Sequence, residues 1–368
     1  MKKVLFLAAA NSVHTVKWVN SLCDKYIVYL VYCKNHKPDI DVINKKVNLY
    51  ELKFNSPSGY YLNVLELKKI FKKVKPDIVN VHYASGYGTL ARLARLSPIL
   101  LSVWGSDIYS FPNESSFNRM VLRRNFNYAK EIASTSNVMA DEIKRQFPFL
   151  KKKIYITPFG VDTDLFKKID VKHDENINIG IVKNLKKIYG IEYGILAIKE
   201  LKNRYNNKGK KNIADSIKFY IYGDGEEKNN LKELIDNNDL SNSIFLKGKI
   251  PNSEVPMAMN HLDVFCATSL NESFGVSLLE AMACELPIVA TNVDGFKEVV
   301  DDGKTGYIVE KENVQKIADA LEKLINNKSL SISMGKNGRK RVLKYYSWDK
   351  NVDNMCKIYD IIIKKYKK

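Results

Sequence analysis

Apolar residues in the first half of the chain occur in short continuous runs, separated by segments with helical spacing. The runs predict strands at 3–10, 27–33, 77–83, 99–104 and 131–136. Unbroken apolar runs of this length indicate strands that are buried on both faces. The intervening segments predict helices at 14–26, 59–74, 88–96 and 119–132. This alternation is typical of a parallel sheet covered by helices on both sides.

The alternation begins again after residue 176. Further strands are predicted at 177–183, 216–223, 243–248, 263–269 and 286–291. Helices are predicted at 191–205, 226–238, 252–262, 274–284 and 314–327, with more helix towards the C-terminus. We therefore expect an α/β protein with two doubly wound, Rossmann-like domains, 1–160 and 161–345, and a terminal helix over 346–368. Ligands of such sheets bind beyond the carboxyl ends of the strands, so we expect a site in the cleft between the domains.

Charge and cysteine content narrow the class of protein. The 368 residues carry 59 Lys and Arg against 41 Asp and Glu, a formal net charge of +18. This balance favours an anionic partner such as nucleic acid, an anionic membrane or a phosphorylated substrate, although solvated Lys-rich faces are the plain alternative. The five cysteines form no CxxC pair, which indicates a reducing compartment rather than a disulfide framework or a zinc site.

The segment MKKVLFLAAANS at the start imitates a signal peptide, but we interpret it as the first buried strand. The longest apolar runs are far shorter than the ~20 residues of a membrane span. We expect a cytoplasmic protein, with peripheral association at the inner face of the membrane as a further expectation. Basic and apolar residues alternate in 62–77 and 359–368, which suit an anionic membrane surface.

Several common motifs are missing or lack their context. There is no GxxxxGK[ST] and no GxGxxG, which argues against an ATPase or a dehydrogenase. The five histidines show no ligand spacing, and DID (39–41) and DTD (162–164) lack the sheet context of a metal site, so we expect no metal. No zinc finger, helix-turn-helix or RNP motif is present, so we expect no nucleic acid.

The stretch NESFGVSLLEAMACELPIVAT (271–291) places two carboxylates around the start of a helix. The amides of Phe274, Gly275 and Val276, after Ser273, lie at the predicted amino end, where a diphosphate would be stabilised. Glu272 and Glu280 could accept hydrogen bonds from hydroxyl groups of a polyol. The plain alternative is a loop glutamate and a solvent-facing helical glutamate.

Residues 271–309 resemble the family 4 glycosyltransferases of the GT-B fold. The resemblance rests on Glu272, seven residues, Glu280, then a strand, Gly295, Glu298 and the DGKTG turn at 302–306. FGVDTDLF (159–166), YGDGEEKNNLKELI (222–235) and NHLDVFCATSLNES (260–273) extend it over about 155–310.

The resemblance implies a transfer with retention of anomeric configuration, from a UDP- or GDP-linked sugar to a hydroxyl of a glycan or lipid-linked acceptor in surface polysaccharide synthesis. It assigns Glu272 to the donor sugar, Glu280 to the ribose and Gly223 to the nucleotide-sugar site, without a metal or other cofactor. The first domain would bind the acceptor, and the terminal helix would cross back to that domain. The alternatives are an epimerase or phosphorylase of the same fold, or an inactive membrane- or nucleotide-binding module.

The family also carries cations for the diphosphate. Lys183 stands where an Arg is usual, and Ile188 where a Lys is usual, so Lys187 is the nearest substitute. Exposed lysines of a Lys-rich loop are the alternative.

On the acceptor side, many relatives have a His at the position of Trp104. Further candidates are Asn11, Ser12, His14, His82 and Asp107. A helix cap is the alternative for Asp107, and packing is the alternative for the two histidines.

Overall fold

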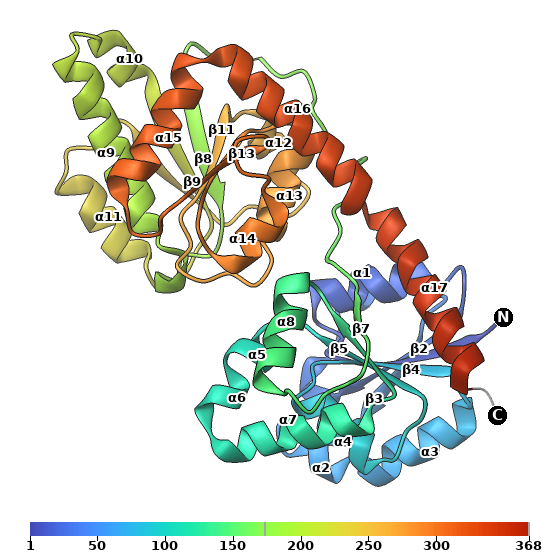
Figure 1. Cartoon of the computed structure of the whole chain (residues 1–368). Coiled ribbons are helices and arrows are strands. Elements are labelled where there is room, and N and C mark those ends of the chain that lie inside the picture. The colour runs from blue at the N-terminus through green and yellow to red at the C-terminus, as the bar shows by residue number, and fades with distance from the viewer. Residues whose placement is uncertain (173, 367–368) are drawn as a thin grey trace. The chain divides into compact units, whose positions relative to one another are not determined.

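The computed structural model describes residues 1–172 and 174–366. The chain divides into two compact units (Figure 1). The first unit comprises residues 1–159 together with the terminal stretch from residue 349, and the second comprises 160–348. The domain boundaries predicted from the sequence fall after residues 160 and 345.

Among the described residues, the first unit is built on a seven-stranded sheet of order β3-β2-β1-β4-β5-β6-β7. Its strands all pair in parallel. Every residue of strands β4 (Ile78–His82) and β5 (Ile99–Val103) is buried, as the continuous apolar runs predict. The strands are β1 (Lys3–Leu7), β2 (Ile27–Cys33), β3 (Asn48–Leu52), β4 (Ile78–His82), β5 (Ile99–Val103), β6 (Glu131–Ser134) and β7 (Ile154–Ile156).

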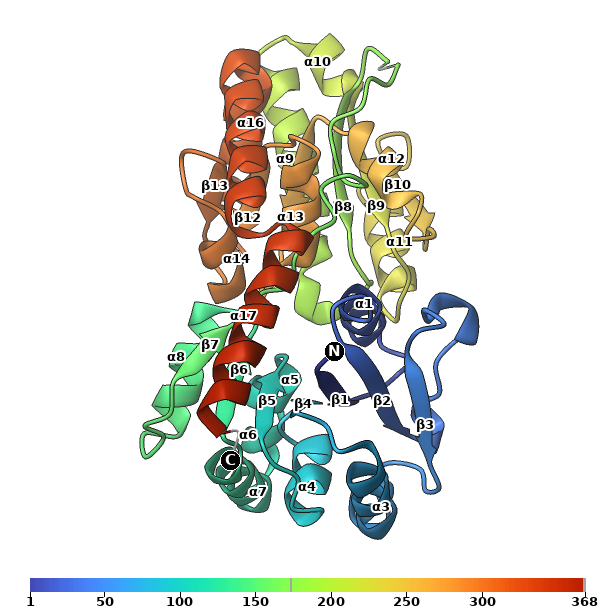
Figure 2. The same cartoon turned by 90° about the vertical axis from the view of Figure 1, so that its right-hand side faces the viewer.

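Helices cover both faces of this sheet: α1 and α17 lie on one side, and α3, α4 and α7 on the other (Figures 1 and 2). The bounds are α1 (Val13–Leu22), α2 (Gly59–Leu62), α3 (Val64–Val74), α4 (Gly86–Leu93), α5 (Ser106–Tyr109), α6 (Phe111–Glu114), α7 (Ser116–Tyr128), α8 (Asn137–Gln146) and α17 (Trp348–Tyr366), with two 3₁₀ turns at Lys34–His36 and Ile40–Val42.

Helix α17 is fastened to the first unit by polar contacts as well as by its apolar face. Asn80 Nδ2 in β4 donates to Tyr359 Oη at 2.6 Å. Near the end of the helix, Lys365 Nζ and Tyr366 Oη contact Glu131 Oε1 at 2.6 and 2.9 Å, and Glu131 is only 2% exposed. A buried carboxylate with two partners makes this end of the helix part of the first unit's core.

In the part of the chain that the structure describes, the second unit holds six parallel strands in the order β10-β9-β8-β11-β12-β13. They are β8 (Ile177–Val182), β9 (Ile217–Tyr222), β10 (Ile244–Gly248), β11 (Val264–Ala267), β12 (Ile288–Thr291) and β13 (Gly306–Val309). The order reverses between β8 and β11, as it does between β1 and β4. The prediction of two parallel, doubly wound sheets is therefore confirmed.

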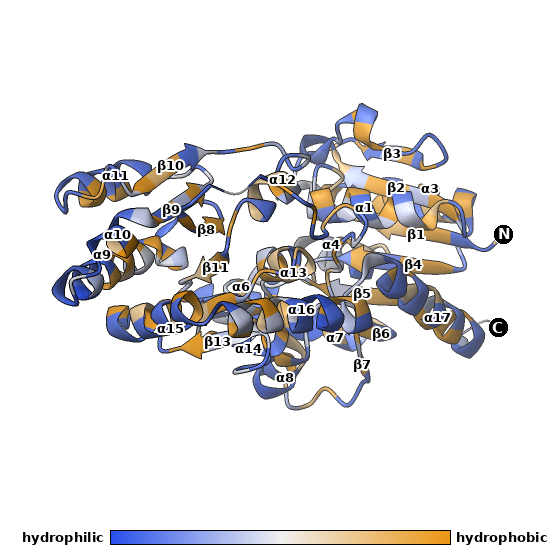
Figure 3. Ribbon diagram, turned by 90° about the horizontal axis from the view of Figure 1, so that it is seen from above, coloured by the Kyte–Doolittle hydropathy of each residue, from blue (hydrophilic) through white to orange (hydrophobic). Residues whose placement is uncertain are grey.

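The helices of the second unit form two layers that follow from right-handed crossovers. Helices α9 and α15 pack together on one face, and α13 and α16 pack together on the other. The colouring of α9, α15 and α16 alternates between hydrophilic and hydrophobic, as expected for helices with one face on a sheet (Figure 3). The bounds are α9 (Ile191–Asn207), α10 (Lys211–Ser216), α11 (Lys228–Asp236), α12 (Val255–Asn260), α13 (Val276–Ala283), α14 (Asp294–Val299), α15 (Val314–Asn326) and α16 (Lys328–Tyr345), with a 3₁₀ turn at Lys187–Tyr189.

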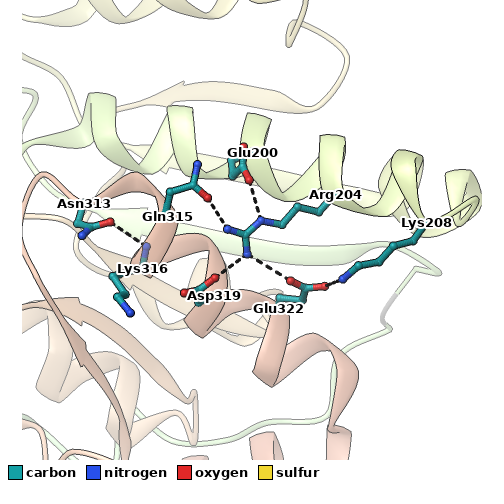
Figure 4. A network of polar contacts seen from close by, with 8 residues as sticks. All are labelled: Glu200, Arg204, Lys208, Asn313, Gln315, Lys316, Asp319 and Glu322. Atoms are coloured by element: carbon teal, nitrogen blue, oxygen red, sulfur yellow. Dashed lines mark hydrogen bonds and ion pairs between the residues drawn. The ribbon is translucent and has the colours of Figure 1, made fainter.

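A charged network joins α9 to α15 on the surface of the second unit (Figure 4). Arg204 donates to Glu200 on its own helix and to Asp319 on α15, both at 2.7 Å. Glu322 of α15 bridges Arg204 and Lys208 at 3.3 and 2.6 Å. Burial alone would lower the pKa of Arg204, but its three carboxylate partners outweigh burial and raise it. The network joins α15 to α9.

One predicted helix is broken in the structure. Residues 59–74 form α2 and α3, which meet at the fully buried Asn63. The Asn63 side chain accepts from Phe54 N and donates to Phe54 O, both at 3.0 Å. These bonds anchor the preceding loop, and a helical pattern alone does not reveal them.

Candidate functional site

The switch point of the second sheet brings together the residues predicted to hold the donor. Lys183 directly follows β8, and Glu272 lies in the loop after β11, the neighbouring strand. In doubly wound folds the crevice at the carboxyl ends of two such strands is the usual place for a ligand. The topology therefore explains how residues 89 positions apart in the chain meet.

Lys183 and Glu272 form an ion pair in this crevice. Their side chains are only 19% and 14% exposed. The Lys183 ammonium also lies 4.3 Å from the centre of the Tyr189 ring, a cation–π distance. A cation held between a carboxylate and an aromatic ring is positioned to meet an incoming anion. Nothing in the sequence pattern singled out Tyr189.

Gly223 supports the same cation from the next strand. Its φ is +148°, and a Cβ at this position would lie 1.8 Å from the carbonyl oxygen of Lys183. Lys183 N donates to Tyr222 O at 2.9 Å, which continues the pairing of β8 and β9 to the rim. Gly223 therefore allows the backbone of its strand to approach Lys183, as no residue with a side chain could.

The loop from Glu272 to Gly275 is shaped by a glycine in the first turn of α14. Gly295 N donates to Glu272 O at 3.0 Å, and a Cβ on Gly295 would lie 2.4 Å from Phe274 N. Phe274 is 2% exposed and anchors the loop in the core. Ser273 N donates to Glu272 Oε1 at 3.2 Å, which holds the carboxylate at the crevice.

Helix α13 begins directly after this loop. Gly275 precedes it with φ +100°, a backbone conformation that favours glycine, and Val276 is its first residue. The amino end of the helix presents amide groups and a positive dipole end beside Glu272. The combination of a helix end and the Lys183 ammonium is suited to a diphosphate.

Glu280 and Lys187, two further residues predicted to bind the donor, are not part of this ion pair. Glu280 lies on α13 and is partly exposed, close enough to Cys284 to contribute to the raised pKa of that thiol, after burial. Lys187 is 69% exposed and pairs with Glu192 Oε1 at 2.6 Å. Ile188, at the position where a Lys is usual, is 44% exposed. The roles proposed for Glu280 and Lys187 stay predictions.

In the first unit, an aromatic cluster occupies the matching switch point. His14 at the start of α1 stacks on Phe159 with ring centres 4.0 Å apart, and its ring centre is 5.6 Å from that of Trp104. His82 ends β4, and its ring centre lies 4.3 Å from that of Trp104. Three predicted acceptor residues are thus neighbours. Phe159 comes from a segment remote in the chain, and nothing in the sequence predicted that it would stack on His14.

Both histidines of this cluster are neutral near pH 7. Burial lowers the pKa of His14 to about 4, with a smaller contribution from Lys17. Burial lowers the pKa of His82 to about 3, with a smaller contribution from His14. His82 Nδ1 lies 3.4 Å from Thr15 Oγ1 in a buried contact. His82 and Trp104 are buried, at 1% and 9% exposed, which favours the packing alternative for His82, whereas His14 is half-buried.

Asp107 is an internal anchor of the strand-end turns. It is 1% exposed and accepts from the backbone amides of Ala84, Trp104 and Gly105 at 2.8, 3.0 and 2.9 Å. Burial raises its pKa, and these bonds oppose the rise. The geometry favours the capping alternative for Asp107 over direct contact with an acceptor. It also explains how Tyr83, at φ +68°, is held in a conformation that is unusual for a bulky residue.

The remaining acceptor candidates, Asn11 and Ser12, form the turn between β1 and α1. Asn11 is exposed, and Ser12 precedes α1 without a side-chain cap. Their contact with an acceptor stays a prediction. In residues 1–172 and 174–366, no group of three His, Cys, Asp or Glu side chains is arranged to hold a metal ion, and no helix is long and apolar enough to cross a membrane.

Comparison with known proteins matches both units. The family described as "Glycosyl transferases group 1" covers residues 162–341, and the one described as "Glycosyl transferase 4-like" covers 3–136. Together with the two Rossmann-like sheets, these matches define a GT-B glycosyltransferase. Relatives with similar names extend over most of the chain. Residues 162–341 and 3–136 each match a glycosyltransferase family, so the predicted resemblance to glycosyltransferases is confirmed.

Three relatives with different printed names align over most of the chain. The N-acetyl-alpha-D-glucosaminyl L-malate synthase of Bacillus anthracis is 26% identical and aligns over 88% of this chain and 84% of its own length. The capsular polysaccharide biosynthesis glycosyltransferase CapM of Staphylococcus aureus is 27% identical over 82% and 81%. The UDP-Gal:alpha-D-GlcNAc-diphosphoundecaprenol alpha-1,3-galactosyltransferase of Escherichia coli is 26% identical over 82% and 80%.

Solved structures confirm the fold. Sucrose-phosphate synthase from Thermosynechococcus elongatus superposes with a TM-score of 0.82 at 16% identity, covering 99% of this chain and all of that one. HepE of Anabaena in complex with UDP-glucose superposes with a TM-score of 0.74 at 17% identity, covering 98% and 100%.

Proposed function

We propose that this chain transfers a sugar from a UDP- or GDP-linked donor to a hydroxyl of a glycan acceptor, with retention of anomeric configuration. The acceptor would be a lipid-linked glycan of surface polysaccharide synthesis. The observation that carries the proposal is the ion pair of Lys183 with Glu272 beside the amino end of α13. The relative of Escherichia coli, whose name specifies UDP-Gal and a diphosphoundecaprenol acceptor, and the Anabaena structure with UDP-glucose support the choice of substrates.

Different residues would bind the diphosphate, the sugar and the ribose of the donor. Its diphosphate binds Lys183 and the first amides of α13, with Lys187 as a second cation at the rim. Glu272 accepts hydrogen bonds from hydroxyls of the donor sugar, and Glu280 from the two ribose hydroxyls. These protein groups neutralise the diphosphate, so the proposal includes no metal and no other cofactor.

The reaction exchanges one bond at the anomeric carbon for another. The bond to the diphosphate oxygen breaks, and the bond to the acceptor oxygen forms on the same face of the sugar. The acceptor proton passes to the departing diphosphate, so charge and protons balance. Lys183 and the helix amides stabilise the negative charge that develops on the leaving group, which is the main electrostatic contribution to catalysis. The neutral His14 and the Trp104 ring contact the acceptor in the first unit.

Time-resolved NMR of the product tests the proposal. The full chain is incubated with UDP- and GDP-linked sugars and a diphosphate-linked glycan acceptor, and the coupling of the new anomeric proton is followed. Transfer with the donor's configuration, lost in Glu272→Gln, is expected. Inversion refutes retention. A donor epimer without transfer, or glycosyl phosphate formed only with added phosphate, indicates the epimerase or phosphorylase alternative. Donor binding without any turnover indicates an inactive module.

We also propose that the chain works in the cytoplasm, docked on the membrane through the first unit. Tyr61, Leu62 and Leu65 are 54%, 56% and 71% exposed at the junction of α2 and α3. Lys69 and Lys72 continue this exposed face of α3, opposite the buried Leu67, Ile70 and Val74. Apolar side chains next to lysines are typical of a surface that lies on anionic lipid. The terminal segment contributes less than its sequence predicts, because Lys365 is paired with Glu131.

A further inference from the structure

A separate pocket lies on the face of the second unit's sheet. It has a volume of about 320 Å³, and its walls include Lys172, Asp174, Asn178, Tyr220, Tyr222 and Leu262. None of the residues assigned to the donor lines it. Asn178 is the second residue of β8, near the amino end of that strand, whereas Lys183 follows its carboxyl end.

The strand pattern explains why this face is open. Along β9, Ile217, Phe219 and Ile221 are buried, and Phe219 lies against Gly194 of α9. Tyr220 and Tyr222 alternate with them, so their half-buried rings lie on the opposite face of the sheet. Phe245 of β10 pairs with Tyr220 and stacks on it, with ring centres 5.3 Å apart and planes 24° apart.

A glycine on β8 leaves room for the opposite wall. Gly180 is the β8 partner of Tyr220 in the sheet. A Cβ at Gly180 would lie 2.7 Å from the Leu262 methyl carbons, so Leu262 can rest directly on the strand only because this residue is glycine. The result is a hollow with an aromatic side formed by Tyr220 and Tyr222 and an aliphatic side formed by Leu262.

The hollow contains a buried acceptor that lacks a donor. Asn178 is 6% exposed, and its Oδ1 has no hydrogen-bond partner among the described residues. Its Nδ2 donates to Asp174 Oδ1 at 3.2 Å, which fixes the orientation of the amide. An unpartnered buried carbonyl is costly, and native structures seldom keep one without a ligand or a water to satisfy it.

The chemistry of the walls selects the ligand. Among the described residues that line the pocket, Lys172 and Asp174 carry opposite charges and His261 adds an imidazole. Asp174 lies close enough to Tyr220 to add to the rise that burial causes in the pKa of that phenol. The described walls offer the Asn178 carbonyl as an unsatisfied acceptor, the Lys172 ammonium as a donor, the His261 imidazole and the faces of Tyr220 and Tyr222. A sugar ring matches this set, because its hydroxyls both donate and accept while its C–H face packs on a ring.

We propose that this pocket is an accessory carbohydrate-binding site that holds one neutral sugar residue of a glycan, apart from the donor site. Its size is at the lower end of the range for small-molecule pockets, which fits a single ring. A hydroxyl of that sugar donates to Asn178 Oδ1, and the ring lies against Tyr220 and Tyr222. Because none of the residues assigned to the donor lines the pocket, the proposal stands independently of the function proposed above.

Saturation-transfer NMR on the full chain tests the site. The probes are methyl α-glucoside, methyl α-galactoside, methyl α-mannoside and methyl N-acetyl-α-glucosaminide, each measured with and without saturating UDP. We expect at least one of them to bind equally in both conditions. Asn178→Leu and Tyr220→Leu are each expected to weaken that binding about tenfold, the effect of losing one hydrogen bond or one apolar contact to a buried group. Tyr307→Leu, a half-buried tyrosine on β13 outside the pocket, is the matched control and leaves binding unchanged.

Tyr222→Leu replaces Asn178→Leu if the buried substitution lowers the melting temperature of the chain. The proposal is overturned if none of the four glycosides binds, or if UDP displaces the bound glycoside. It is also overturned if the Asn178 and Tyr220 variants bind as the wild type does, or if inorganic phosphate binds with the same dependence on Asn178.

Discussion

The Lys183 ammonium and the Glu272 carboxylate are paired at the carboxyl ends of two adjacent strands, each side chain less than one-fifth exposed. Each charge of the pair compensates the other, which matters because an unpaired charge in such a partly buried place is costly. In the function proposed above, a diphosphate that binds Lys183 would replace Glu272 as the partner of the ammonium, and Glu272 would then accept hydrogen bonds from hydroxyl groups of the donor sugar.

Replacing Lys183 by Met should weaken binding of UDP or GDP by about 1.5 to 3 kcal/mol, the value of a charge-assisted hydrogen bond. Calorimetric titration should show this loss for the nucleoside diphosphate and no loss for the nucleoside, which lacks phosphate. Lys187→Met is the control, because Lys187 is exposed and paired with Glu192, and it should cost less.

The double variant Lys183→Met/Glu272→Gln separates binding from folding, since it removes both charges of the pair. It should recover most of the thermal stability lost in Lys183→Met but none of the diphosphate affinity. An unchanged affinity for UDP and GDP in Lys183→Met would remove Lys183 from the donor site.

Glu280→Ala tests the ribose contact. Loss of a carboxylate that binds two hydroxyls should weaken the nucleotide by about 1.5 to 3 kcal/mol, with a small effect on the melting temperature because the side chain is partly exposed. The 2′-deoxy nucleotide is the internal control: it should bind the wild type more weakly and lose little further affinity in Glu280→Ala. Equal losses for both nucleotides would argue for an indirect effect through α13.

The sequence predicted the strands of both sheets best where apolar runs are continuous. Strand β2 has the predicted bounds, 27–33, because it is buried along its length. Strand β3 was missed, because NLYEL at the sheet edge mixes polar and apolar positions and only Leu52 is buried. Helix α8 was missed as well, since its polar segment reads as a continuation of the loop.

The sequence likewise predicted one part of the candidate site and missed another. Glu272 and Gly275 carry a local pattern, and the sequence placed them correctly at the start of a helix. The partners that define their environment come from elsewhere in the chain. Tyr189 beside Lys183 and Phe159 on His14 meet their neighbours only through the order of the strands. Spacing along a sequence contains no information on such contacts, whereas the topology supplies it.

Activity should survive removal of divalent metal ions. The proposed seat of the diphosphate contains Lys183 and helix amides, and these groups neutralise the leaving group without a metal. Initial rates with EDTA should therefore match those with added magnesium, once the donor is repurified from metal. A complete loss in EDTA that magnesium restores would contradict this expectation.

His82 should make the first unit sensitive to acid. Its pKa is about 3 in the folded chain, mainly because of burial, and about 6.5 when unfolded. As pH falls below 6.5 the unfolded chain binds the proton first, so stability is complete above that pH and is lost as pH falls towards 3. Between pH 7 and 5 the loss from this group is about 2 kcal/mol. Urea unfolding at both pH values should show this loss in the free energy of unfolding. His14, whose pKa in the folded chain is about 4, should add a loss in the same direction.

His82→Phe should reduce the difference between the two pH values by the contribution of this group. His261→Gln is the control, since His261 is exposed and should leave the difference as it is. A wild-type stability that is the same at pH 7 and 5, or an unchanged difference in His82→Phe, would show that protonation of His82 is not coupled to unfolding.

Vesicle sedimentation tests the membrane surface on α2 and α3. Each lysine near anionic lipid contributes about 1 kcal/mol, and the attraction decays within a Debye length. The chain should therefore bind vesicles rich in phosphatidylglycerol, be released as salt rises, and bind weakly when Lys68, Lys69, Lys72 and Lys73 become Glu. Leu62→Ser/Leu65→Ser should weaken binding in a salt-independent way, because these two exposed side chains enter the lipid interface by burial of apolar area.

A control with the same change of charge decides whether α3 matters or only the charge of the whole chain. Helix α16 in the second unit has four exposed lysines, Lys328, Lys336, Lys340 and Lys344, and their replacement by Glu alters net charge equally. If α3 is the docking surface, the α16 variant keeps most of its vesicle affinity and the α3 variant does not. Equal losses would mean that the net charge of +18 attracts lipid without a defined face. Binding that survives both sets of substitutions would refute electrostatic docking altogether.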